Sequence, residues 1–106
     1  MSLRPDALRR VAALACMGVI AAPLQASGGD IAYGEYLAGD CTGCHRPEGA
    51  EGIPSIAGRA PEDFTAALAA FRDGSRDNPA MRLMAERVTE EEVAALAAYF
   101  QTIEPY

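Results

Sequence analysis

A five-residue segment, Cys41-Thr42-Gly43-Cys44-His45, limits the folds that are open to this chain. Two cysteines separated by two residues, with a histidine directly after the second, form the attachment pattern of a c-type haem. In that chemistry the two thiols add to the vinyl groups of the haem, and the histidine binds the iron from the proximal side. The segment therefore predicts one covalent haem c, held by Cys41 and Cys44 and ligated by His45.

Two other chemistries use cysteines at this spacing. A thioredoxin-like redox pair lies in a βαβ pattern, and no such pattern surrounds Cys41 and Cys44. A structural zinc site needs four ligands, and no further cysteine or histidine follows His45. The spacing and the lack of additional ligands both favour haem.

The first 26 residues have the layout of a secretory signal peptide. They begin with a basic stretch, continue with an uncharged apolar run over residues 11–22 that Pro23 breaks, and end in a cleavage site at Leu24-Gln25-Ala26. A retained membrane anchor is the alternative, but the run is shorter than the roughly 18 apolar residues that a spanning helix needs. Lipidation at Cys16 is a weaker alternative, because cleavage there would leave too short an apolar core. We expect residues 1–26 to be cleaved and residues 27–106 to form one periplasmic domain, with no membrane attachment after processing.

The charge balance excludes some classes of partner. The formal net charge is −6, and all nine basic side chains are arginine, with no lysine. An acidic domain without a basic stripe is a poor candidate for binding nucleic acid or an anionic membrane surface. A domain of this size buries little apolar surface by itself, and a covalent haem would stabilise it.

The hydrophobic pattern predicts an all-α domain. Asp30 should cap a short helix over residues 31–39 that ends at Gly39, with Tyr33, Tyr36 and Leu37 facing inward. A helix from Pro61 to Asp73 has an apolar stripe. A capping box at Thr89 opens a last helix that ends before Pro105. The expected core residues of the latter two helices are Phe64, Leu68, Phe71, Val93, Leu96, Ala97, Phe100 and Ile103.

The loop over residues 46–58 is expected to lie against the haem. A proximal histidine needs an acceptor for its second ring nitrogen, and a backbone carbonyl of this loop is the nearest candidate in sequence. Ile53 and Ile56 flank Pro54 in this segment, and apolar residues in a loop rich in glycine and proline suggest packing against the porphyrin.

Two methionines, Met81 and Met84, are candidates for the second axial position of the iron. They are separated by about one helical turn, so at most one can bind the iron, and the other would fill the core. The residues themselves leave this choice open.

These segments together resemble a class I cytochrome c, which they match along nearly the whole of residues 27–106. The similar stretches are the haem motif, Pro54-Ser55-Ile56-Ala57-Gly58, Met81 and Leu96-Ala97-Ala98-Tyr99-Phe100. The resemblance implies that the carbonyl of Pro54 accepts a hydrogen bond from His45. Residues 53–59 and 81–89 are also similar to the cytochrome subunit of flavocytochrome c sulfide dehydrogenases. In that pattern the iron-binding methionine stands four residues before the alanine, which here selects Met81.

The resemblance implies a small class I cytochrome c fold wrapped around one haem, and an electron carrier rather than an enzyme. By its similarity to the sulfide dehydrogenase subunit, the chain would accept electrons from an FAD-containing flavoprotein and pass them to another cytochrome. A free shuttle between periplasmic partners is the alternative. A haem sensor or a peroxidase-like enzyme would need an open iron position and distal polar groups, and the only histidine is already used.

The charges of the two segments expected around the haem bear on the choice between a stable subunit and a free shuttle. Residues 41–59 contain two arginines and two glutamates, and residues 72–82 contain three arginines and two aspartates. A nearly neutral face suits a stable subunit interface, whereas a free shuttle gains speed from a strongly charged face. The sequence therefore favours the subunit.

Overall fold

The computed structural model describes Gly18 and residues 29–105 of the chain. The described part contains five helices: α1 (Ile31–Leu37), α2 (Gly39–Thr42), α3 (Pro61–Asp73), α4 (Pro79–Arg87) and α5 (Glu90–Gln101). Within these residues the only β-type pairing is an isolated bridge between Ala50 and Ile53. The all-α prediction is confirmed for this part of the chain. The expected signal peptide lies outside the described residues, and none of the described helices is long and apolar enough to span a bilayer.

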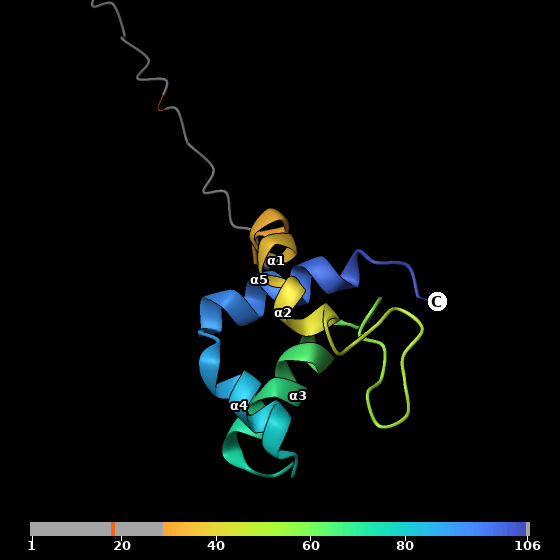
Figure 1. Ribbon diagram of the computed structural model, residues 1–106. Coiled ribbons are helices and arrows are strands. Elements are labelled where there is room, and N and C mark those ends of the chain that lie inside the picture. Colours follow the sequence, from red (N-terminus) through yellow and green to blue (C-terminus); the bar gives the residue numbers. More distant parts are fainter. Residues whose placement is uncertain (1–17, 19–28, 106) are drawn as a thin grey trace, which may run out of the picture.

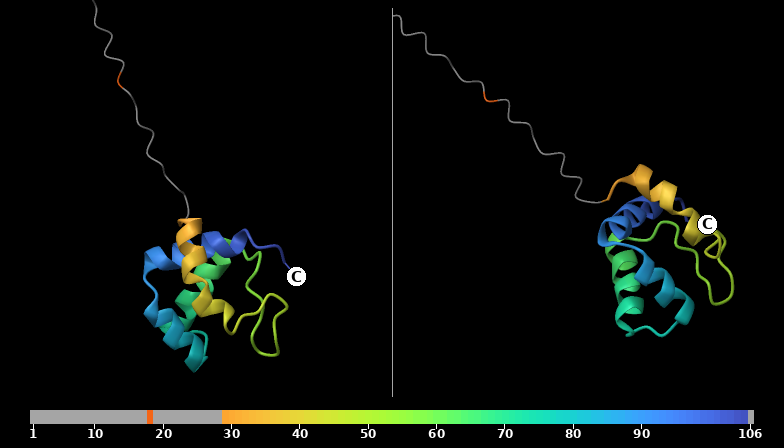
Figure 2. Two further views of the ribbon diagram at one scale, coloured as in Figure 1. Left: turned by 45° about the horizontal axis from the view of Figure 1, so that its top comes forward. Right: turned by 60° about the vertical axis from the view of Figure 1, so that its left-hand side comes forward.

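The first and last helices cross at close range (Figures 1 and 2). Asp30 caps α1 as expected, because its carboxylate accepts hydrogen bonds from the amides of Ala32 at 2.9 Å and Tyr33 at 3.2 Å. Gly34 is the buried residue of α1. A Cβ atom at Gly34 would overlap the carbonyl oxygen of Ala95 in α5, so only a glycine permits this approach of the two backbones.

The expected inner face of α1 is wrong for both tyrosines and confirmed for Leu37. Tyr33 and Tyr36 are exposed, at 36% and 82% of their surface, whereas Leu37 is half-buried and packs against the core. Gly34 and Ala38 are the buried residues of this stretch, and Gly34 faces the backbone of α5. The physical reason is the close crossing, because a tyrosine ring on that face would hold the two helices apart.

Gly39 also does not end the helical path. The C-cap of α1 is Ala38, and α2 starts directly after it. The amide of Cys41 donates to the carbonyl of Ala38 at 2.9 Å, which continues the turn into the cysteine motif. Cys41, in α2, therefore follows directly after the helix that crosses α5.

The core lies where α3, α4 and α5 meet. Its buried residues include the predicted stripes of the two longer helices, Phe64, Leu68, Phe71, Val93, Leu96, Ala97 and Phe100. The capping box of α5 is confirmed: the Glu92 amide donates to the Thr89 hydroxyl at 3.1 Å, and the Thr89 amide donates to the Glu92 carboxylate at 3.0 Å. α5 ends at Gln101, so Ile103 lies beyond the helix rather than on its stripe.

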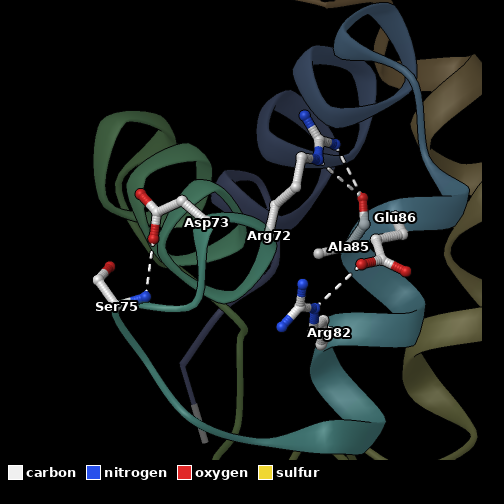
Figure 3. Close-up of polar contacts among 6 residues, drawn as sticks. All are labelled: Arg72, Asp73, Ser75, Arg82, Ala85 and Glu86. Carbon is white, nitrogen blue, oxygen red and sulfur yellow. Dashed lines mark hydrogen bonds and ion pairs between the residues drawn. The ribbon is translucent and has the colours of Figure 1, made fainter.

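Arg72 joins the end of α3 to the end of α4 (Figure 3). Its guanidinium group donates to the carbonyl of Ala85 at 2.8 and 3.2 Å, and to the carbonyl of Val88 at 2.9 Å. The last carbonyls of a helix have no partner within that helix, and a cation near them is favourable. This contact fixes α4 against α3, and α4 carries both methionines.

Candidate functional site

A cavity of about 560 Å³ lies between α2, the loop that follows it, α3 and α4. Figure 1 shows that loop on one side of the molecule and the α3–α4 pair on the other. All residues predicted for the haem site line this cavity: Cys41, Cys44, His45, Ile53, Pro54, Ile56 and Met81. Core side chains from α3 and α5 also line it, among them Phe64, Leu68, Phe71 and Leu96. The structure therefore brings the predicted residues together in a largely apolar space.

The cysteine motif is held as a compact turn at the end of α2. The amides of Cys44 and His45 both donate to the carbonyl of Cys41, at 3.2 and 2.8 Å. No disulfide joins Cys41 to Cys44. Burial raises the pKa of the Cys41 thiol, and the nearby carboxylate of Asp40 raises it further. The fold thus presents two separate sulfur atoms and one imidazole to the same cavity.

His45 is oriented by the loop. Its Nδ1 atom lies 2.7 Å from the carbonyl oxygen of Pro54. A carbonyl oxygen only accepts hydrogen bonds, so Nδ1 must carry the proton and donate it. The lone pair of the neutral imidazole is then on Nε2, which is the nitrogen left free to bind a metal.

Backbone hydrogen bonds hold the segment around Pro54 in place on both sides. On one side, Ala50 and Ile53 exchange backbone hydrogen bonds of 2.8 and 3.0 Å across a two-residue turn. On the other side, the Gly58 amide donates to the carbonyl of Phe100 in α5 at 2.8 Å. These bonds set the position of the carbonyl that orients His45.

The wall that faces the loop is formed by α4. Met81 and Met84 are both half-buried and both line the cavity. Met84 also borders a smaller neighbouring cavity of about 220 Å³, which Met81 does not. The structure therefore brings both thioethers to the site.

Three residues that the sequence reasoning missed also line the cavity: Arg59, Arg76 and Asn78. The guanidinium carbon of Arg76 lies 4.3 Å from the ring centroid of Phe71. Arg59 and Arg76 are the cationic side chains of the lining, and Asp40 and Asp77 balance them. The signal for Asn78 was its position directly before a proline, since asparagine is a preferred N-cap and proline a preferred first helical residue.

The residues present suit a haem. The cavity offers an apolar surface for a porphyrin, paired thiols for its vinyl groups, one imidazole with a free nitrogen, and a thioether on the opposite wall. Arginines could pair with the carboxylates of the haem. Within residues 29–105, no group of three or more histidine, cysteine, aspartate or glutamate side chains could hold a metal ion, and the zinc alternative requires such a group.

A helical domain with this motif on the wall of an apolar cavity defines a c-type haem protein. Residues 29–100 match the family described as "Cytochrome C oxidase, cbb3-type, subunit III". The chain belongs to this family of c-type cytochromes and carries haem c covalently.

Several curated relatives are similar to the chain. The cytochrome subunit of sulfide dehydrogenase from Chlorobaculum tepidum is 42% identical over 69 residues, which cover 63% of each protein. The thiosulfate dehydrogenase electron acceptor of Thiomonas intermedia is 36% identical over 103 residues, 92% of this chain and 46% of the relative. Cytochrome c-554(548) of Halomonas halodenitrificans is 35% identical over 83 residues, 72% of this chain and 99% of the relative. The chain thus spans less than two thirds of the first two relatives. The matches confirm the resemblance to small c-type cytochromes, including a sulfide dehydrogenase subunit.

Proposed function

We propose that the chain is the one-haem cytochrome subunit of a periplasmic flavocytochrome. It accepts electrons from an FAD-containing sulfide dehydrogenase flavoprotein and passes them to another cytochrome. Similarity to the Chlorobaculum tepidum subunit supports this function, and so does the similarity to a thiosulfate dehydrogenase electron acceptor.

The observation that carries the proposal is the nearly neutral, partly apolar surface beside the cavity. The two arginines of the cavity lining are matched by two aspartates, and Ile53 is 37% exposed at the same site. The core of a stable protein interface is depleted in charge, whereas transient docking of a free carrier relies on charge steering. The surface composition therefore favours a lasting complex.

In this function each site residue has a role. Cys41 and Cys44 tether the haem, which supplies a reversible one-electron change at its iron. His45 would hold the iron through Nε2, and the carbonyl of Pro54 keeps the ring in the tautomer that leaves this nitrogen free. Ile53 and Ile56 pack against the porphyrin and exclude water.

Met81 is proposed as the distal ligand, and Met84 as a packing residue. A neutral thioether favours ferrous iron and raises the reduction potential. If Met81 is the ligand, Met81→Ala should abolish the weak sulfur-to-iron charge-transfer band of the oxidised protein in the far red, and should lower the potential. Met84→Ala is the matched control and should retain the band. The reverse result would assign the ligand to Met84.

The periplasmic location depends on export. We propose that residues 1–26 are a cleaved signal peptide, so the mature protein should have the mass of residues 27–106 plus one haem. Intact mass spectrometry of the periplasmic fraction tests this. A lipid-modified protein that retains Cys16 would contradict it.

The complex is tested by co-purification of the tagged protein from its native host, with a flavin absorption spectrum of the product. The complex should survive gel filtration at about 0.5 M salt, where the Debye length is roughly 4–5 Å and exposed charge pairs are screened. A flavoprotein that elutes with the cytochrome at low salt but separately at high salt would favour the free shuttle instead. A protein that is monomeric at both salt concentrations and exchanges electrons with several unrelated cytochromes would favour the free shuttle more strongly.

A further inference from the structure

The N-terminus of α4 is fixed by one side chain. The Oδ1 atom of Asn78 accepts a hydrogen bond of 3.0 Å from the amide of Met81. The backbone carbonyl of the same asparagine accepts from the amide of Arg82 at 2.9 Å, and Pro79 occupies the first helical position. Asn78 therefore fixes the backbone of Met81 through a side-chain hydrogen bond.

The location of this cap gives it a role beyond helix stability. Asn78 is half-buried and lines the same cavity as Met81. The first residues of a helix fray when their amides have no acceptor. Met81 is the third residue of α4, so fraying at this end would move its thioether away from the cavity, whereas Met84 lies a turn deeper in the helix.

We propose that Asn78 is a positioning residue for the axial ligand of the haem iron. It acts through the backbone of Met81: the cap holds the first turn of α4 in the conformation that keeps the thioether directed to the iron. The inference rests on the proposed assignment of Met81 as the distal ligand.

The expected effect follows from the cost of losing a cap. Replacing an asparagine cap by alanine costs a helix about 1 kcal/mol, which is a factor of about five in an equilibrium constant. If loss of the cap destabilises the conformation in which Met81 binds the iron, the population in which Met81 is detached should rise about fivefold. An external ligand that competes with the methionine should then bind about five times more tightly.

The experiment uses the haem-loaded, oxidised protein and imidazole as the competing ligand. Imidazole affinity is measured by optical titration, with the far-red charge-transfer band recorded alongside. Asn78→Ala should increase the affinity about fivefold. Asn78→Ser keeps a capping oxygen and should restore the affinity of the wild type.

Thr89→Ala is the matched control, because it removes the cap of α5 and Thr89 does not line the cavity. It should lower the unfolding free energy by a similar amount and leave imidazole affinity unchanged. Unchanged affinity in Asn78→Ala, or an equal increase in Thr89→Ala, would overturn the proposal. Retention of the charge-transfer band in Met81→Ala would instead refute Met81 ligation itself, so the two failures are distinguishable.

Discussion

Gly34 is a residue at which a single added methyl group should destabilise the fold. It lies where α1 crosses α5, with the backbone of Ala95 against it. In Gly34→Ala the new Cβ would overlap the Ala95 carbonyl oxygen. It would also lie 2.6 Å from the Ala95 carbonyl carbon and 2.7 Å from the Cβ of Tyr99, where ordinary contact begins at 3.4 Å. α1 would have to move outward by at least about 0.8 Å to clear these two carbon atoms, and further to clear the oxygen.

The magnitude follows from two opposing effects. Overpacking a tight contact costs about 1–3 kcal/mol, and the upper end applies because a backbone atom has no alternative rotamer. Alanine is favoured over glycine in a helix by about 1 kcal/mol, which offsets part of that cost. We therefore expect the free energy of unfolding to fall by about 2 kcal/mol. For a domain of this size that corresponds to a decrease in Tm of about 8–16 °C.

Gly39→Ala is the matched control for this prediction. Gly39 is also helical, has no atom within 4 Å of a built Cβ, and does not have a positive φ. This variant should be neutral or more stable by up to about 1 kcal/mol. Denaturant unfolding of both haem-loaded variants, followed by far-UV circular dichroism and by the Soret band, measures the difference. Equal stability of the two variants would refute the role of the close crossing.

Three further predictions concern polar side chains. Arg72→Met should lower the free energy of unfolding by about 1–3 kcal/mol, measured by denaturant titration, because it leaves carbonyls at the end of α4 without their donor. The pKa of Asp73 is lowered by a hydrogen bond from the Ser75 amide, so its carboxylate stabilises the fold above its ordinary pKa of 3.8 and loses this contribution as the pH falls. Asp73→Asn should accordingly reduce the loss of stability in acid unfolding below about pH 4. Arg76→Gln should lower the reduction potential in a potentiometric titration, because loss of a cation at the cavity favours the ferric state. Arg82→Gln is the control and should leave the potential unchanged, because Arg82 is paired with Glu86 and does not line the cavity.

The prediction for α1 shows where sequence reasoning failed. The helix is short, and its large apolar residues suggested an inner face that contained both tyrosines. The buried residues are instead Gly34 and Ala38, and Gly34 allows the close approach to α5. Hydrophobic periodicity counts large side chains, so it does not detect packing through small residues whose partner is some 60 positions away in the chain.

The sequence by itself determined the chemistry of the site and most of the helices. The cysteine motif, the caps at Asp30 and Thr89 and the stripe of α3 are local patterns, in which the interacting groups stand within a few residues of each other. Local geometry determines such patterns independently of how the rest of the chain folds. The turn that contains the two thiols and the imidazole is such a local pattern.

Only the tertiary structure decided which distant groups share the cavity. It placed Arg59, Arg76 and Asn78 in the lining, and it joined the end of α3 to the end of α4 through Arg72. These contacts depend on how α3, α4 and the loop pack around one space, and no local pattern encodes that packing. The fold thereby decides which side chains surround the haem, because its cavity is bounded by elements that are distant in sequence, and α5 packs against both α1 and α3.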